Sequence, residues 1–385
     1  MRERAGAARV ISGAARAATA LRRGAVLLAL PLTLSCARSA PEPWQEVRLG
    51  TDARFGGLWF TDSLNGWIAG GAREVPGGLL GRTRDGGRSW TIRSNVLPDM
   101  EPGVHLAGIQ FRDSSNGCVV AEGGMVLLTA DGGLNWRRVR SGRSSSDGLM
   151  RVQLLDDHYG WAVGSASLVG TRDGGETWGG LVYNSDENGY LSGTAVAFTD
   201  PSRGWLVTHS GQLMRSDDGG VHWTQVPLPL DPGSHPILWD ITFTDPEHGW
   251  LVGEEGTICR TSDGGATWEM QTSGVPLLRA LPRGEKPRRP DIIPGLDGGP
   301  SHLTLTAVRF ADVRRGFALG FYSDAGESVI LGTRDGGATW RTERVAPGQY
   351  LHALFVLDRT HAWAAGDRER MLPQVMYRYT APDSG

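Results

Sequence analysis

The chain has 385 residues, a formal net charge of −3, 56 glycines and 14 tryptophans. Lys286 is the only lysine, and the chain lacks the clustered positive excess that nucleic-acid binders carry. Many glycines indicate many turns, and many tryptophans indicate large apolar side chains that must be buried repeatedly rather than in one core. The composition therefore excludes a typical nucleic-acid-binding protein and favours short strands over long helices.

The N-terminus has the features of an export signal. A basic segment precedes an apolar run at residues 25–34, which is followed by Ser35 and Cys36. The apolar run is too short for an ordinary membrane-spanning helix, and the order of the three features is typical of a secretory signal peptide. We therefore expect residues 1–35 to be removed on export. The basic segment contains Arg2, Arg4, Arg9, Arg16, Arg22 and Arg23 against the single acidic Glu3.

The sequence LTLSC at residues 32–36 resembles the lipobox of bacterial lipoproteins, in which the cysteine is lipidated after cleavage. Thr33 and Leu34 depart from the usual pattern, so cleavage by an ordinary signal peptidase stays open. The resemblance implies a protein of the cell envelope, either periplasmic or an outer-membrane lipoprotein. We expect a linker at 36–42, and a lipid on Cys36 as the only attachment to a membrane.

Two further cysteines, Cys118 and Cys259, lie far apart in the sequence. Cysteine is often buried as a small apolar side chain. We therefore expect two buried thiols rather than a disulfide.

One eight-residue motif, [ST]-x-D-x-G-x-x-W, occurs six times, for example as TRDGGETW from Thr171 to Trp178. Successive aspartates of this motif are 46, 42, 45, 45 and 72 residues apart. A period near 45 matches one four-stranded blade of a β-propeller. The six aspartates are Asp85, Asp131, Asp173, Asp218, Asp263 and Asp335.

A second motif runs in phase with the first. It has an apolar residue, an aspartate two positions later, and then a glycine and an aromatic residue, as in FTDPEHGW from Phe243 to Trp250. Seven copies are present, against six of the first motif. They begin at Phe60, Phe111, Leu154, Phe198, Phe243, Phe310 and Val356.

Trp44 explains the mismatch between the two counts. It lies 18 residues before Asp62, and the same interval separates Trp340 from Asp358. Trp44 thus occupies the place of the tryptophan in a seventh copy of the eight-residue motif, which we call the box. The strand that begins at Trp44 would then complete the blade formed by the other end of the chain. A ring closed in this way leaves no open sheet edge. We predict an all-β, seven-bladed propeller of four-stranded antiparallel blades over residues 43–385, with an insertion at about 275–303.

The repeated residues favour a structural role. The Ser/Thr and Asp side chains of the box can accept backbone N–H bonds two or three residues ahead, and the glycines supply positive φ. A single carboxylate per turn does not match a calcium loop, so we expect no metal and no cofactor. Both repeated turns should share one rim, which leaves the non-repetitive loops on the opposite rim free to carry function.

These motifs resemble the Asp-box, or bacterial neuraminidase repeat, propellers. The combination FxDxxxGW with TxDGGxTW at this period is most similar to the photosystem II stability and assembly factor family and its bacterial relatives. The resemblance covers residues 43 to 380. It implies an exported, non-enzymatic binding protein that uses an arginine-rich patch to escort membrane-protein subunits and pigments during assembly. The insertion departs from the family pattern.

We expect a monomer that binds a protein partner, a membrane protein or its assembly intermediate, on the non-repetitive rim. The insertion carries a basic cluster among prolines, although a solvated loop would look the same. Three further candidates, near the starts of the innermost strands, are expected to line the mouth of the central channel. The candidate partner-binding residues are Arg279, Arg283, Lys286, Arg288 and Arg289 of the insertion, with Arg151, Asp240 and His352 of the channel mouth.

Two alternatives stay open. A glycoside hydrolase of the sialidase type would need paired carboxylates on the rim, but the Phe/Tyr-Arg-Ile-Pro stretch of sialidases is absent from the sequence. A carbohydrate-binding module would use rim aromatics as stacking surfaces. The rim carboxylates considered are Asp147, Asp186, Glu187, Asp240, Glu254, Glu255 and Asp324, and the aromatics are Trp239, Tyr183, Tyr190, Tyr322 and Tyr350.

Overall fold

The computed structural model describes residues 42–72, 75–96, 104–140, 148–164, 167–181, 192–275, 278–279, 301–323, 325–368 and 374–381. Residues 42–385 form one compact unit and residues 1–41 are assigned to another, which lies outside the described residues. The predicted signal peptide and Cys36 fall in that N-terminal part. All regular elements of the described residues are β-strands, arranged as seven antiparallel sheets.

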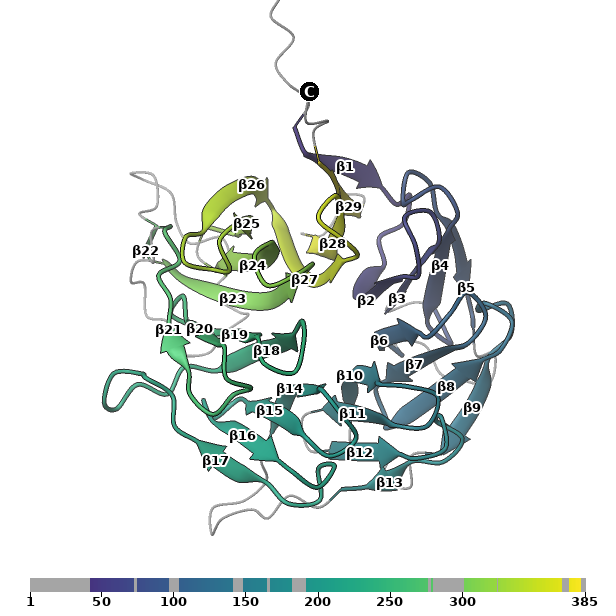
Figure 1. Ribbon diagram of the computed structural model, residues 1–385. Helices are drawn as coiled ribbons and strands as arrows, with labels where there is room; N and C mark the ends of the chain where they lie inside the picture. Colours follow the sequence, from purple (N-terminus) through teal and green to yellow (C-terminus); the bar gives the residue numbers. More distant parts are fainter. Residues whose placement is uncertain are drawn as a thin grey trace, which may run out of the picture. The chain divides into compact units, whose positions relative to one another are not determined.

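The first four blades are sequential four-stranded meanders (Figure 1). Blade one contains β2 (Arg54–Phe60), β3 (Gly66–Gly71), β4 (Leu79–Thr83) and β5 (Thr91–Ser94). Blade two contains β6 (Leu106–Phe111), β7 (Gly117–Ala121), β8 (Met125–Thr129) and β9 (Arg137–Arg140). Blade three contains β10 (Leu149–Leu154), β11 (Gly160–Gly164), β12 (Ser167–Thr171) and β13 (Gly179–Gly180). Blade four contains β14 (Gly193–Phe198), β15 (Gly204–Thr208), β16 (Leu213–Ser216) and β17 (Thr224–Val226).

The last three blades include the two departures from a simple meander. Blade five contains β18 (Leu238–Phe243), β19 (Gly249–Gly253), β20 (Ile258–Thr261) and β21 (Glu269–Met270). Blade six contains β22 (Leu278–Arg279), β23 (Ser301–Phe310), β24 (Gly316–Tyr322), β25 (Glu327–Thr333) and β26 (Arg341–Pro347). Blade seven contains β27 (Gln349–Val356), β28 (His361–Arg368), β29 (Val375–Thr380) and β1 (Trp44–Arg48), in the order β1-β29-β28-β27.

Blade seven confirms the predicted closure of the ring. β1 pairs antiparallel with β29 from Trp44 opposite Tyr379 to Arg48 opposite Val375. The Trp44 side chain is 1% exposed and packs edge-on against Phe317 of blade six, with ring centroids 5.2 Å apart. The N-terminal strand therefore completes the last sheet, and its tryptophan fills the seam to the neighbouring blade.

Strand starts in blade one follow the repeated motifs closely. β3 begins at Gly66, one residue before the aromatic of the second motif, and β5 begins one residue after the box residue Trp90. Blade six differs from the prediction, because β22 pairs with residues 301–302 of β23 and makes a five-stranded sheet. Part of the insertion thus extends the innermost strand of this blade.

Five of the seven seams between blades contain a stacked Trp–Phe pair. In blade one, Trp67 stacks on Phe111 of blade two at 3.8 Å and 16°, and Phe111 meets the box residue Trp136 edge-on at 6.0 Å. The Trp67 indole also donates a 3.0 Å hydrogen bond to Gly132 O in the box of blade two. Burying a large aromatic side chain contributes about 2 to 3 kcal/mol, so a repeated seam of this kind holds thin sheets together.

The same seam recurs around the ring. Four more Trp–Phe stacks have ring centroids between 3.6 and 4.2 Å, and three of them carry the corresponding indole-to-glycine hydrogen bond at 2.9 Å. The pairs are Trp161 with Phe198, Trp205 with Phe243, Trp250 with Phe310, and Trp363 with Phe60. The last pair joins blade seven to blade one.

Candidate functional site

The two repeated turns lie on one rim, as the sequence predicted. In all six boxes the first glycine N–H donates to a carbonyl of the neighbouring turn from the second motif, as from Gly174 to His158 O at 2.8 Å. A side chain at Gly174 is disfavoured, because its φ is 73° and a Cβ there would lie 2.5 Å from Asp157 O. We call this the box rim. The opposite rim, which carries the loops between the second and third strands of each blade and the links between blades, we call the link rim.

The polar groups of each box are engaged within their own turn. In blade three, the Thr171 hydroxyl donates to Asp173 Oδ1 at 2.8 Å and accepts from Gly175 N at 2.9 Å. Asp173 Oδ1 also accepts from Thr177 N at 2.9 Å. The bond from Asp173 N to the Thr171 hydroxyl, at 3.3 Å, spans the two residues expected from the sequence, and the other two bonds to backbone N–H groups span four. Hydrogen bonds from the side chain and backbone of Thr177, and from Thr171, lower the pKa of Asp173 to about 2.

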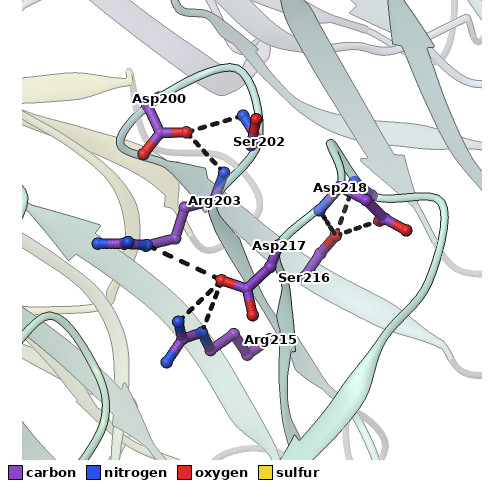
Figure 2. A network of polar contacts seen from close by, with 8 residues as sticks. Asp200, Ser202, Arg203, Arg215, Ser216, Asp217 and Asp218 are labelled. Atoms are coloured by element: carbon purple, nitrogen blue, oxygen red, sulfur yellow. Dashed lines mark hydrogen bonds and ion pairs between the residues drawn. The ribbon is translucent and has the colours of Figure 1, made fainter.

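Blade four shows how the two turns are joined (Figure 2). Asp200 Oδ1 accepts from Ser202 N and Arg203 N at 2.8 Å, which fixes the turn of the second motif. Asp217 of the box pairs with Arg215 at 2.8 Å and contacts Arg203 at 3.9 Å. Within the described residues, no group of three or more His, Cys, Asp or Glu side chains could hold a metal ion.

The central channel brings together two of the predicted site residues. The innermost strands of the blades, β2, β6, β10, β14, β18, β23 and β27, follow one another around the centre of the propeller (Figure 1). Arg151 of β10 and Asp240 of β18 line the same pocket of about 520 Å³, together with Arg309 of β23. Asp240 is 1% exposed, and its Oδ2 accepts from Val308 N at 3.0 Å and from Arg309 Nη1 at 2.5 Å.

Of the two arginines in this pocket, Arg309 forms a close ion pair with Asp240, whereas Arg151 forms none with a described carboxylate. Burial lowers the pKa of its guanidinium, the charge of Asp240 opposes that change, and the charge of Arg309 adds to it. The sequence analysis did not single out Arg309. Its position next to the apolar residue of the second motif, at the end of an innermost strand, was the signal that could have identified it.

His352 belongs to a separate cluster that spans blades seven, one and two. Its Nε2 lies 3.7 Å from Asp367 Oδ1, and the exposed Arg54 reaches Asp367 Oδ2 at 3.9 Å. Burial lowers the pKa of His105, with opposition from Asp367 and reinforcement from His352 and Arg54. Burial raises the pKa of Tyr350, as do the charges of Asp367 and Glu254. We call Arg54, His105, Tyr350, His352 and Asp367 the rim cluster.

The rim cluster gathers around the beginnings of innermost strands. Arg54 begins β2, His105 immediately precedes β6, and Tyr350 and His352 lie near the start of β27. These strands begin at the link rim and end at the repeated turns of the box rim. The sequence predicted the position of His352 in this region but missed Arg54, His105 and Asp367, which come from other blades or strands.

The remaining candidates are dispersed. Arg279 is in β22, whereas Arg283, Lys286, Arg288 and Arg289 lie outside the described residues. Glu254 accepts from Ile237 N at 3.3 Å, and Glu255 accepts from the Ser234 hydroxyl at 3.4 Å. Trp239 meets His209 edge-on at 5.2 Å, Tyr350 meets Phe321 at 4.6 Å, and Tyr322 is buried. Asp147, Asp186, Glu187, Asp324, Tyr183 and Tyr190 also lie outside the described residues.

The expected state of the two cysteines is confirmed. Cys118 and Cys259 are free and buried, and burial raises the pKa of each thiol to about 12. No helix in the described ranges is long and apolar enough to cross a membrane.

Comparison with known proteins identifies relatives by sequence. The family model described as photosynthesis system II assembly factor YCF48 matches residues 36–146, 144–236 and 225–280. The photosystem II assembly lipoprotein Ycf48 of Synechococcus sp. strain CC9902 is 29% identical over 141 residues, 36% of this chain and 40% of that protein. The Picosynechococcus sp. PCC 7002 lipoprotein of the same name is 34% identical over 91 residues, 23% of this chain and 25% of that protein. These matches thus span less than half of either relative.

Solved structures share the fold over most of the chain. A structure described as YCF48 bound to D1 peptide has a TM-score of 0.62 at 18% identity, covering 88% of this chain and 95% of that one. YCF48 from Cyanidioschyzon merolae has a TM-score of 0.61 at 18% identity, with 89% and 99% covered. A GH74 xyloglucanase from Xanthomonas campestris has a TM-score of 0.58 at 16% identity, with 87% of this chain and 55% of that one covered. With the family model matching well over half of its length, the chain belongs to the Ycf48 family of photosystem II assembly factors.

Proposed function

We propose that this protein is an exported, non-enzymatic assembly factor that captures a protein partner on its link rim. The observation that carries the proposal is the rim cluster, in which ionisable side chains from three blades meet at the starts of innermost strands. At the box rim, by contrast, the box carboxylates are engaged within their own turns. Side chains that vary from blade to blade are suited to recognition, because loops on a rigid scaffold carry most binding residues.

The relatives support a protein as the partner. One related structure is described as holding a D1 peptide, and the family description names assembly of a photosystem. For this chain we propose a membrane protein or its assembly intermediate as the partner, bound by a monomeric propeller. The exposed guanidinium of Arg54 and the half-buried His352 give the link rim groups that can donate hydrogen bonds to a peptide backbone or to acidic side chains.

The proposal also includes the location and the insertion. Relatives are named lipoproteins, which supports lipidation of Cys36 after removal of residues 1–35 and a place in the cell envelope. The basic residues Arg279, Arg283, Lys286, Arg288 and Arg289 of the insertion are proposed to extend the binding surface, because β22 continues the sheet of β23 at its link-rim end.

Affinity purification of the tagged, exported protein tests the proposal. We expect Arg54→Ala with His352→Ala, and separately deletion of residues 279–290, to reduce recovery of a specific co-purified envelope protein at least fivefold. Arg341→Ala on the exposed outer strand of blade six is the matched control and should leave the yield unchanged. Equal recovery with all variants would overturn the assignment of the link rim. Turnover of a fluorogenic glycoside by the protein, abolished by a rim carboxylate substitution, would instead support the hydrolase alternative.

A further inference from the structure

A second feature of the channel is independent of the proposed partner surface. All seven innermost strands have a register irregularity at the same place, where one residue is skipped in the pairing with the second strand of the blade. The equivalent position is the first residue that pairs after the skipped one. At that equivalent position five blades have glycine or alanine, and two blades have oppositely charged side chains. The residues in blade order are Gly57, Gly108, Arg151, Ala195, Asp240, Ala307 and Ala353.

The small residues at this position are buried between innermost strands, and none of them lines the channel pocket. In blades one and two the position is restricted to glycine, because a Cβ on Gly57 would lie 2.9 Å from the Ile109 side chain and one on Gly108 would lie 2.9 Å from Met150 O. Ala195 of blade four lies between the blades of Arg151 and Asp240 and adds only a methyl group. Arg151 and Asp240 are therefore the long side chains of this register, and both line the 520 Å³ pocket.

The two arginines of the pocket differ in their ion pairing. Asp240 Oδ2 is occupied by Val308 N and Arg309, and Arg309 Nη1 also donates to Val308 O at 2.6 Å. Among the described residues, Arg151 has no carboxylate within the 4 Å of an ion pair. Asp245 at the edge of the pocket accepts from Glu247 N and His248 N within its own turn. Arg151 is half-buried and its guanidinium has no close carboxylate among the described residues, which favours an anionic ligand there.

The same pocket has an aromatic wall. Trp59 of β2 and Phe355 of β27 line it, and their rings meet edge-on with centroids 4.8 Å apart. Trp59 is half-buried and Phe355 is 9% exposed. Arg151 and Asp240 come from blades three and five, whereas the aromatic pair comes from blades one and seven. The pocket therefore presents a guanidinium and an apolar aromatic surface to one volume, and pockets of about 300 to 1,000 Å³ suit small molecules.

We propose that this channel pocket binds a small aromatic carboxylate, with its carboxylate on Arg151 and its ring against Trp59 and Phe355. Arg151 supplies two parallel N–H donors, which match the two oxygens of a carboxylate. The aromatic wall supplies an apolar surface for the planar body.

Isothermal titration of the full exported protein with 2-naphthoate tests this proposal. We expect saturable one-to-one binding to the wild type and at least tenfold weaker binding to Arg151→Met. The control Arg341→Met alters an exposed arginine on the outermost strand of blade six and should leave the affinity unchanged. Trp59→Leu should also weaken binding. The neutral 2-naphthamide should bind at least tenfold more weakly than the acid.

The comparison of acid and amide needs no variant, so it decides the requirement for charge even where Arg151→Met fails to fold. Near-ultraviolet circular dichroism establishes whether that variant keeps the wild-type packing. Three results would each overturn the proposal: no saturable binding of 2-naphthoate to the wild type, equal binding of acid and amide, or unchanged affinity in a folded Arg151→Met variant.

Discussion

Replacing Trp44 by alanine tests the closure of the ring directly. The Trp44 side chain is 1% exposed, packs against Phe317 and Tyr379 at 5.2 and 5.3 Å, and donates through Nε1 to Glu343 Oε2 at 3.3 Å. Burial of the side chain contributes about 2 to 3 kcal/mol, and the cavity that remains after a large-to-alanine change in a core raises the total cost to about 3 to 5 kcal/mol. We expect the free energy of unfolding to fall by about 4 kcal/mol, a large part of the stability of an ordinary domain.

Urea denaturation followed by circular dichroism measures this loss. Trp136→Ala is the matched control, because Trp136 occupies the same place in a box but is half-buried and donates within its own turn to Gly133 O at 3.2 Å. We expect about half the destabilisation there, since less area leaves water. A loss in Trp44→Ala below about 1 kcal/mol, or one no larger than in Trp136→Ala, would show that the N-terminal strand does not hold the ring closed.

Three further changes probe the seams, the boxes and the thiols. Gln110→Leu removes two hydrogen bonds between blades, from Gln110 Nε2 to Leu154 O at 2.9 Å and from Leu154 N to Gln110 Oε1 at 2.7 Å. This change should lower the free energy of unfolding by about 2 kcal/mol, and an unchanged urea midpoint would contradict it. The pKa of Asp173 and four other box aspartates is lowered to about 2 in the folded state. Their contribution to stability is therefore present above the unfolded pKa near 3.8 and is lost as the pH falls toward 2. A urea midpoint that stayed constant from about pH 5 to about pH 2.5 would contradict this contribution. Cys118 and Cys259, with their pKa raised to about 12, should react with Ellman's reagent only after unfolding, and rapid labelling of the native protein would refute their burial.

The sequence predicts the architecture well because the repeated residues act locally or between adjacent copies. The aspartate and glycines of a box build a turn from neighbouring residues, and the phase between the two motifs determines the number of strands. Trp44 could be assigned to a seventh box because its spacing to Asp62 repeats that of Trp340 to Asp358. β22 was not predicted, since its two residues pair with a strand more than twenty positions away and have no repeated counterpart.

The site residues were less predictable because their partners come from different blades. Asp240 and Arg309 are 69 residues apart and touch only because adjacent innermost strands lie side by side. Asp367 joins His352 from the next strand and Arg54 from the next blade. No periodic pattern marks these residues, which occupy repeated positions but differ in type from blade to blade. An alignment of the seven strands by their second motif places Arg151 and Asp240 at one level, but their packing required the structure.

Each innermost strand separates repetition from variation along its length. In five blades its end at the box rim carries a phenylalanine that stacks on the tryptophan of the preceding blade, as Phe111 does on Trp67, whereas blades three and seven have Leu154 and Val356 there. Its middle, at the register irregularity, lies three positions before the residue at the seam, so a side chain there is not itself a member of the aromatic stack. Arg151 and Asp240 stand at this level, where five blades keep a glycine or an alanine. A charged side chain at this level therefore replaces no residue of the stacks that hold the blades together, and in blades three and five it reaches the channel pocket.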